Sequence, residues 1–227
     1  MLKYLLNLFY PKVCSGCSQF ILESENHLCT VCRHEIPLTN HTAFKENEAY
    51  KKFYGRIPTQ HVSSMFYYHK KGVTQQLIHN LKYKNQQHIG TILGEWYAEE
   101  LAQQSVIKSA DYIIPVPLHK KRLKERGYNQ VTTFCNALGK ELNINVNNDL
   151  LFRNHHTISQ SKKNLTSRSN LAENTFDIHF DEQHHNKHFL IVDDVLTTGA
   201  TLESCGRAIL KIPGAKVSIV TMAFSES

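Results

Sequence analysis

The sequence predicts an α/β protein, with a parallel sheet flanked by helices and a small cysteine-rich module in front of it. From residue 61 onward, apolar segments of strand length alternate with segments of helical periodicity, an order typical of parallel sheets with helices on both faces. Four of the six cysteines fall within the first 32 residues. At 227 residues, the chain is long enough for one such domain and a small appendage.

The N-terminal module contains two C-x2-C pairs, Cys14 with Cys17 and Cys29 with Cys32. Two such pairs can present four thiolates to a Zn²⁺ ion, and an all-cysteine site would be closed and structural. The alternatives are two disulfides, disfavoured because no signal peptide is evident, and a redox C-x-x-C motif, disfavoured by the duplication. We expect a zinc-binding module over residues 1–40. It would serve as a docking or nucleic-acid surface, or would simply stabilise a knuckle too short to have its own core.

Composition and charge narrow the class of protein. With 41% hydrophobic and 20% charged residues, the chain has the composition of a soluble globular protein. No apolar run reaches membrane-spanning length, and residues 2–10 lack a cleavage site, so they predict an amphipathic helix and not a signal peptide. We expect a cytoplasmic protein. The net charge of +6 suits an anionic ligand, either a pyrophosphate or a nucleic acid.

The main domain is expected to span residues 59–227, after a polar linker over residues 40–58 that Gly55 interrupts. Helices are assigned where apolar residues recur on one face, and strands where β-branched and aromatic residues cluster. The expected order is strand 61–69, helix 72–83, helix 89–104, strand 111–118, helix 129–142, strand 189–195, helix 198–211 and strand 216–224.

The segment 189–201, FLIVDDVLTTGAT, is the most informative part of the chain. An apolar strand ends in Asp193 and Asp194, and a turn rich in threonine and glycine leads into a helix. A helix start offers free N–H groups and a positive dipole to a phosphate, while the carboxylates can accept hydrogen bonds from sugar hydroxyls or a metal-bound water. The alternative is a strand that ends at an ordinary helix cap.

Two basic segments are expected near this site. Residues 119–130 contain five basic residues and one acid and are interpreted as a loop at a strand's carboxyl end, where a diphosphate could be clamped. Residues 153–170 contain basic residues but no acid and are interpreted as a loop over the site. The alternatives are a solvated basic loop and a disordered linker. The histidines at 155, 156, 184, 185 and 188 are expected to be exposed.

The segment 189–201 resembles the ribose-phosphate signature of type I phosphoribosyltransferases, and nearly the whole chain resembles the ComF family of competence-associated proteins related to them. The matching parts are the four-cysteine knuckle, residues 77–83, 115–118, 126–130, 159–160 and 168–170, and the Asp193 loop. The resemblance implies a type I phosphoribosyltransferase-like fold with a zinc-ribbon-like module. It also implies binding of phosphoribosyl pyrophosphate (PRPP) with Mg²⁺.

By this resemblance, the catalytic residues would be Asp193, Asp194 and Arg126. The ribose hydroxyls would lie against the two acids, and the 5′-phosphate in the loop that follows them. The other expected ligand-binding residues are Val195, Leu196, Thr197, Thr198, Gly199, Ala200, Thr201, Lys82, Lys120, Arg122, Asn129, Gln130, Gln160 and Arg168.

Two functions follow from these expectations. In the first, the protein binds PRPP or a related ligand and acts in DNA uptake and transformation, in contact with single-stranded DNA and the uptake machinery. In the second, it is an active Mg²⁺-dependent phosphoribosyltransferase in nucleotide metabolism with no role in DNA handling. The sequence leaves open whether catalysis occurs and which acceptor would be used.

Overall fold

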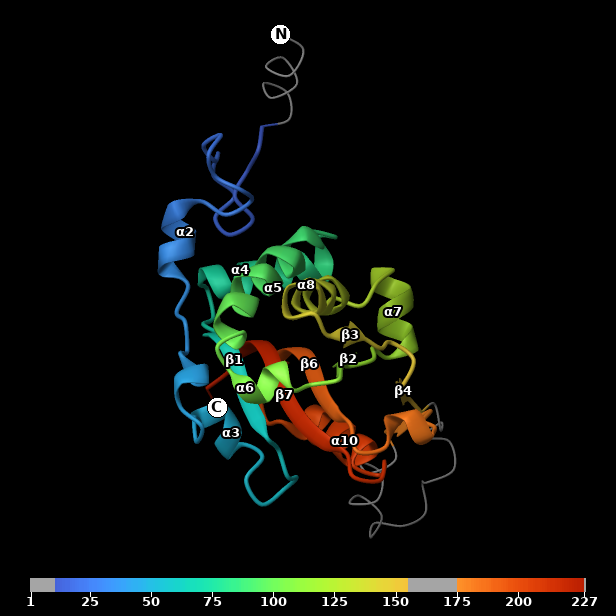
Figure 1. Ribbon diagram of the computed structural model, residues 1–227. Helices are drawn as coiled ribbons and strands as arrows, with labels where there is room; N and C mark the ends of the chain where they lie inside the picture. The colour runs from blue at the N-terminus through green and yellow to red at the C-terminus, as the bar shows by residue number, and fades with distance from the viewer. Residues whose placement is uncertain (1–10, 155–174, 227) are drawn as a thin grey trace, which may run out of the picture.

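The computed structural model describes residues 11–154 and 175–226 (Figure 1). Its centre is a five-stranded sheet with the order β1-β7-β6-β2-β3, in which every neighbouring pair is parallel. The strands are β1 (His61–Tyr67), β2 (Tyr112–Pro115), β3 (Asn145–Val146), β6 (His188–Leu196) and β7 (Lys216–Phe224). The predicted fold class is therefore confirmed, and each predicted strand of the main domain lies in this sheet.

Helices cover both faces of the sheet (Figure 1). Three long helices, α4, α5 and α8, lie on one face, and α10 lies on the other. The helices are α2 (Thr30–Glu35), α3 (Glu48–Lys51), α4 (Val73–Tyr83), α5 (His88–Leu101), α6 (Ser105–Lys108), α7 (Lys120–Arg126), α8 (Thr132–Leu142) and α10 (Ala200–Ile209), with short 3-10 turns at His41–Ala43 and Glu182–His184.

Strand β6 separates the two halves of the core. Side chains alternate between the faces of a strand, so Leu190 and Val192 pack with α4, α5 and α8, while Phe189 and Ile191 pack with α10. The central position of β6 explains its continuous apolar sequence, because a parallel strand covered on both sides has no solvent face. Cys135 of α8 and Cys205 of α10 are buried in these two cores.

Helices α5 and α8 approach each other closely because glycines line their contact. A Cβ atom at Gly94 would lie 2.7 Å from the Cβ of Ala137 and 2.8 Å from the carbonyl oxygen of Phe134, a separation that folded proteins do not tolerate. This close packing holds the start of α8 against the sheet and so positions the residues just before it.

The interpretation of residues 40–58 as a linker is wrong. Ala49, Phe53 and Ile57 recur at four-residue spacing and are all buried in the core on the α10 face. Asn47 donates hydrogen bonds to the carbonyl oxygens of His41 (2.9 Å) and Val62 (2.8 Å) and so ties the segment to β1. The polar composition conceals this apolar spacing. The proposed division into residues 1–40 and 59–227 stays a prediction.

The remaining differences concern short elements and histidines. Strands β3, β4 (Leu151–Arg153) and β5 (Phe176–Ile178) are too short to predict, and the last two form a separate antiparallel pair. His184 and His188 are buried, not exposed, and the Nε2 atom of His188 lies 2.8 Å from the hydroxyl of Ser218. The expected helix over residues 2–10, His155, His156 and most of the expected loop over 153–170 lie outside the described residues. Within the described ranges, no helix is long and apolar enough to cross a membrane.

Candidate functional site

Two adjacent carboxylates stand near the carboxyl end of β6. Asp194 is 7% exposed. Its Oδ2 atom forms an ion pair of 2.8 Å with the Nζ atom of Lys82 and accepts a hydrogen bond of 2.6 Å from the Nε2 atom of Gln130. Lys82 comes from the last turn of α4, and Gln130 lies just before α8. The fold therefore brings together three predicted site residues that are far apart in the sequence.

The neighbouring Asp193 has a different electrostatic environment. Burial, and then the adjacent charge of Asp194, raise the pKa of Asp193 to about 8. The Oδ1 atom of Asp193 accepts a 2.8 Å hydrogen bond from the backbone N–H of Asp194, and the nearby charge of Lys82 opposes only part of the pKa increase. At neutral pH, Asp193 therefore retains its proton in the ligand-free protein.

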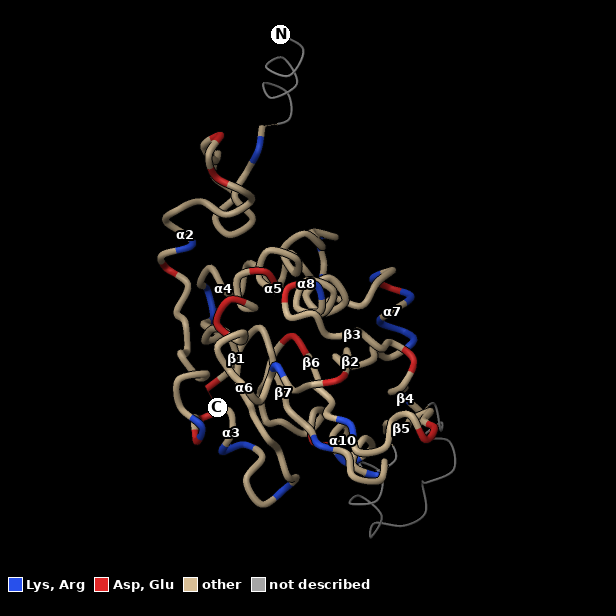
Figure 2. The backbone as a smooth tube through the Cα atoms, in the orientation of Figure 1, with Lys and Arg blue, Asp and Glu red and all other residues tan. Residues whose placement is uncertain are grey.

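The basic segment after β2 was expected to be a loop, but its centre forms the helix α7. The ring Nδ1 of His119 accepts a hydrogen bond of 3.2 Å from the Lys121 N–H at the helix start. At the other end, Gly127 adopts φ 78° and donates its N–H to the Leu123 carbonyl, and lysine and arginine are good helix formers. Figure 2 shows the basic residues along this helix, none of which is buried.

Arg126 links α7 to the acidic pair. Its Nη1 atom donates a 2.7 Å hydrogen bond to the Oε1 atom of Gln130, whose amide in turn donates to Asp194. The guanidinium also lies 5.0 Å from the centre of the Tyr83 ring, a cation–π contact. The result is a continuous polar chain from Arg126 through Gln130 and Asp194 to Lys82.

The other residues of this segment have separate roles. Asn129 donates a hydrogen bond of 2.9 Å to the Val116 carbonyl and so fastens the turn to the end of β2. Lys120 is exposed at the first position of α7. A cavity of 260 Å³ is lined by Lys82, Tyr83, Asn85, Arg122, Glu125, Arg126 and Tyr128. Arg122 therefore lines the same cavity as Lys82 and Arg126. Asn129 instead stabilises the turn through its hydrogen bond to the Val116 carbonyl.

The turn after β6 leads into the N-terminus of α10. Gly199 adopts φ 79° directly before the helix, and a Cβ atom there would lie 3.2 Å from the Phe53 ring, so both conformation and space favour glycine. The hydroxyl of Thr198 accepts a long 3.4 Å hydrogen bond from the Ala200 N–H. Thr197, Thr198, Ala200 and Thr201 are exposed, whereas Leu196 and Gly199 are buried and Val195 is half-buried. The helix start is open to a ligand from solvent.

A larger cavity of 590 Å³ adjoins both the acidic pair and this turn. Lys82, Val195 and Thr197 line it on one side. The rest of the wall comes from Tyr68, Gln75, Gln76, Ile78, His79, Tyr83 and Ser225. Gln75 and Gln76 of α4 belong to no sequence motif, because polar residues on a helix surface follow no recognisable pattern, whereas His79 lies in the segment 77–83 that matches the ComF family.

The four predicted metal ligands, Cys14, Cys17, Cys29 and Cys32, come together, with their Sγ atoms within 4.8 Å of one another. Burial alone would raise the pKa of Cys14, but backbone N–H donors, including those of Cys29 and Gly16, lower it to about 7, whereas burial raises the pKa of Cys32. Donors of this kind stabilise the thiolate form that a metal requires. The cluster can therefore hold a metal ion, and its all-sulfur ligand set fits a closed tetrahedral zinc site.

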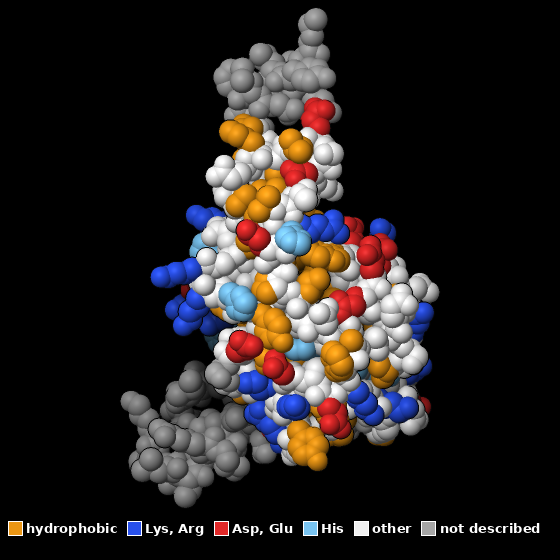
Figure 3. Space-filling model, turned by 90° about the vertical axis from the view of Figure 1, so that its left-hand side faces the viewer, with side chains coloured by type: hydrophobic (Ala, Val, Ile, Leu, Met, Phe, Trp, Pro, Cys, Tyr) orange, Lys and Arg blue, Asp and Glu red, His pale blue; other side chains and the backbone are white. Residues whose placement is uncertain are grey.

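The cysteine module is docked on the main domain. The Nδ2 atom of Asn80 in α4 donates a hydrogen bond of 2.9 Å to the Ser15 carbonyl, and the hydroxyl of Ser15 lies 2.9 Å from the Nε2 atom of His88 in α5. The outer surface of the module has exposed apolar side chains (Figure 3), among them Phe20, Leu22 and Val31. The helix that carries Lys82 is thus braced by the cysteine module.

The fold and the site agree with a family match, since residues 133–227 match a family model described as a phosphoribosyl transferase domain. This match begins at α8, so Lys82, Arg126 and Gln130 lie outside it. Among solved structures, adenine phosphoribosyltransferase from Leishmania tarentolae aligns with 62% of this chain and 73% of its own, at a TM-score of 0.37 and 15% identity.

The relatives are named for competence and DNA utilization, and they confirm the resemblance to the ComF family. Competence protein F of Haemophilus influenzae is 26% identical over 95% of this chain and 98% of its own length. Competence protein ComFC of Bacillus subtilis is 25% identical over 93% of this chain and 83% of its own. DNA utilization protein YhgH of Shigella flexneri is 29% identical, and the match covers 63% of each protein, slightly less than two thirds.

Proposed function

We propose that this protein binds PRPP or a related phosphoribosyl ligand with Mg²⁺ at the end of β6, and that it acts in DNA uptake and transformation. The observation that carries the ligand proposal is the contact of Asp194 with Lys82 and Gln130, directly beside the turn into α10. The names of the relatives, two competence proteins and a DNA utilization protein, support the biological role. A cytoplasmic location and a structural Zn²⁺ in the cysteine cluster belong to the same proposal.

In this proposal, the ligand lies across the site from α10 to α7. Its 5′-phosphate binds at the N-terminus of α10, between the turn N–H groups and the threonine hydroxyls. The ribose hydroxyls lie at Asp193 and Asp194, and the diphosphate faces Lys82, Arg122 and Arg126. Mg²⁺ retains most of its waters and is held by ligand phosphates and carboxylate oxygens. Gln160 and Arg168 lie outside the described residues, so only the family resemblance assigns them to the ligand.

A second candidate function is phosphoribosyl transfer in nucleotide metabolism without a role in DNA handling. The same residues would then orient PRPP and stabilise the charge that develops on the leaving pyrophosphate. The cavity of 590 Å³ beside Val195 and Thr197 favours this candidate, because an acceptor would have room next to the ribose. Release of pyrophosphate in the presence of an acceptor would distinguish a transferase from a protein that only binds its ligand.

Calorimetric titration of the zinc-loaded protein with PRPP and Mg²⁺ tests the ligand proposal. We expect binding by the wild type and loss of at least tenfold in affinity in Asp193→Asn/Asp194→Asn, since hydrogen bonds to charged groups contribute roughly 1.5–3 kcal/mol each. The matched control is Glu95→Gln/Glu99→Gln, which neutralises two exposed acids on α5. A folded wild-type protein that binds no PRPP would contradict the proposal.

Fluorescence anisotropy with a single-stranded oligonucleotide tests the DNA contact. We expect Lys120→Gln/Lys121→Gln/Arg122→Gln to weaken binding and to reduce the slope against log salt by about 2, since each phosphate contact contributes about 0.7. The control Lys45→Gln/Lys70→Gln/Lys71→Gln removes equal charge from other exposed positions. Point variants are preferable to deletion of residues 1–40, because Cys14, Cys32 and Ile36 belong to the core. Wild-type binding that does not depend on salt would contradict this contact.

A further inference from the structure

The residues that pack against the turn into α10 come from a distant part of the chain. Phe53 is 1% exposed, and its ring lies directly under Gly199. Arg56 follows three residues later and reaches the same turn. Both residues belong to the segment that the sequence suggests is a linker, and both lie outside residues 133–227, which match the transferase family model. A part of the molecule with no motif of its own therefore supports the proposed phosphate site.

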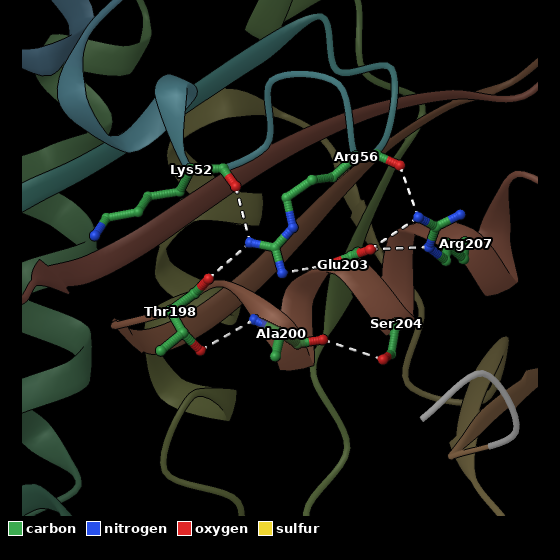
Figure 4. Close-up of polar contacts among 7 residues, drawn as sticks. All are labelled: Lys52, Arg56, Thr198, Ala200, Glu203, Ser204 and Arg207. Carbon is green, nitrogen blue, oxygen red and sulfur yellow. Dashed lines mark hydrogen bonds and ion pairs between the residues drawn. The ribbon is translucent and has the colours of Figure 1, made fainter. Parts of the chain in front are cut away.

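Arg56 makes three contacts that hold its guanidinium against the turn (Figure 4). Its Nη1 atom donates hydrogen bonds to the carbonyl oxygens of Thr198, at 2.8 Å, and Lys52, at 3.0 Å. Its Nη2 atom lies 2.5 Å from the Oε2 atom of Glu203 in the first turn of α10. One side chain therefore joins the turn, the first turn of the helix and the segment below them.

Arg207 helps to keep this arrangement in place. Its Nη2 atom donates to the backbone carbonyl of Arg56 at 3.0 Å and to the Oε1 atom of Glu203 at 2.8 Å, and its Nε atom donates to the same Oε1 atom at 3.0 Å (Figure 4). Glu203 thus binds two guanidinium groups, one through each carboxylate oxygen. Arg56 contacts the turn through the Thr198 carbonyl, whereas Arg207 contacts Glu203 and the Arg56 carbonyl, and this difference provides a matched control.

The contact with Thr198 has a consequence for the next residue. The carbonyl of Thr198 and the N–H of Gly199 belong to one planar trans peptide unit, in which the two groups point in opposite directions. Arg56 holds the carbonyl on its own side, so the Gly199 N–H points to the other side, away from the guanidinium. Gly199 adopts φ 79°, and glycine restricts the orientation of its peptide less than any other residue. The hydrogen bond from Arg56 to the Thr198 carbonyl therefore restricts the orientation of the Thr198–Gly199 peptide, which glycine alone would leave less restricted.

We propose that Arg56 is a positioning residue for phosphate binding: it fixes the Thr198–Gly199 peptide so that the Gly199 N–H faces the 5′-phosphate. This inference rests on the proposed function, because it assumes that the turn into α10 binds a phosphate. Arg56 acts through the backbone and does not touch the ligand. The chain thereby gains a preorganised N–H donor at the start of α10.

Titration with ribose 5-phosphate, which carries the phosphate and the hydroxyls without the diphosphate, tests the inference. We expect Arg56→Ala to lower the affinity about tenfold, the effect of losing one well-aligned hydrogen bond to a charged group. Arg56→Lys keeps a cationic donor and should have an intermediate affinity. Arg207→Ala breaks the same Glu203 cluster without removing the Thr198 contact, and should bind within about twofold of wild type.

The Gly199 amide resonance supplies a readout that a general loss of stability would not change. In wild type, ribose 5-phosphate should shift this resonance strongly, and in Arg56→Ala the shift should be lost while the resonances of β7 stay unchanged. Wild-type affinity in Arg56→Ala, or an equal loss in Arg207→Ala, would overturn the positioning role. A wild-type protein that binds no ribose 5-phosphate would instead overturn the proposed function, and the inference with it. If Arg56→Ala does not fold, Arg56→Lys decides by the same comparison.

Discussion

The two adjacent carboxylates of β6 have different partners and different electrostatic surroundings. On the face of α4, α5 and α8, Asp194 is paired with Lys82 and accepts a hydrogen bond from Gln130. Asp193 accepts a hydrogen bond from the Asp194 N–H, and burial and the charge of Asp194 raise the pKa of Asp193 to about 8. The difference comes from burial and from the partners that the fold supplies, because the two side chains are chemically identical. Identical side chains in one motif therefore have different electrostatic surroundings before a ligand arrives.

The supports of the two faces differ as well. The cysteine module packs on α4 and α5 and shares their core through Cys14 and Cys32. The α10 face is supported by the segment that carries Ala49, Phe53 and Ile57. One face therefore depends on a cluster that can hold a metal, and the other depends on apolar packing with an arginine cluster at its edge. Because the cysteine module and the segment with Ala49, Phe53 and Ile57 contact different faces, a substitution can disturb one support and leave the other intact.

Loss of the metal site should have the largest effect. We expect Cys32→Ser to abolish stoichiometric zinc, and structural zinc sites of this kind contribute on the order of 10 kcal/mol of binding free energy. Hydrogen exchange should then increase in residues 12–36 and in α4 more than in β7. Metal analysis with hydrogen-exchange mass spectrometry measures both effects. The control Cys205→Ser changes a buried thiol on the α10 face and should keep the zinc. Retention of one zinc per chain by Cys32→Ser would contradict the four-cysteine site.

Removal of the cation beside Asp194 should have an intermediate effect. Lys82→Met leaves a buried carboxylate with only its Gln130 contact, and a broken buried ion pair costs about 3 kcal/mol. Urea denaturation measures the free energy of unfolding. Lys84→Met, two residues further along, removes an exposed lysine and should change stability by less than about 0.5 kcal/mol. Equal stability of the two variants would show that Lys82 does not compensate the charge of Asp194.

The protonation of Asp193 should produce the smallest of the three effects. Its pKa in the folded state, about 8, is above its ordinary value of 3.8, so the folded state holds an additional proton between these pH values. Stability from this group is therefore lost as the pH rises through that range. Relative to Asp193→Asn, the wild type should lose about 2 kcal/mol between pH 6 and pH 8.

Denaturation curves of both proteins at several pH values measure this effect. Asp194→Asn is the informative comparison, because it removes the neighbouring charge that helps to raise the pKa of Asp193 and should weaken the pH dependence. Parallel pH profiles for wild type and Asp193→Asn would contradict a protonated Asp193.

The sequence alone determined the features that depend on neighbours in the chain. The two cysteine pairs, the apolar strand of β6, the acids near its end and the turn into α10 are all continuous patterns, in which each residue type has a local physical reason. Helices α4, α5 and α8 were predictable for the same reason, since their apolar residues recur at helical spacing. The helix α7 was missed because its charged residues have no apolar face, and only its caps at His119 and Gly127 signal it.

Only the tertiary structure decided which distant residues meet and what charge they carry. The contacts of Lys82 and Gln130 with Asp194 join α4, the residues just before α8 and β6, and the contact of Arg56 with Thr198 joins residues 142 positions apart. No local pattern encodes such pairs, because they follow from the packing of helices on both faces of one sheet. The raised pKa of Asp193 depends on the same packing, since burial is a property of the assembled core and not of the Asp-Asp motif.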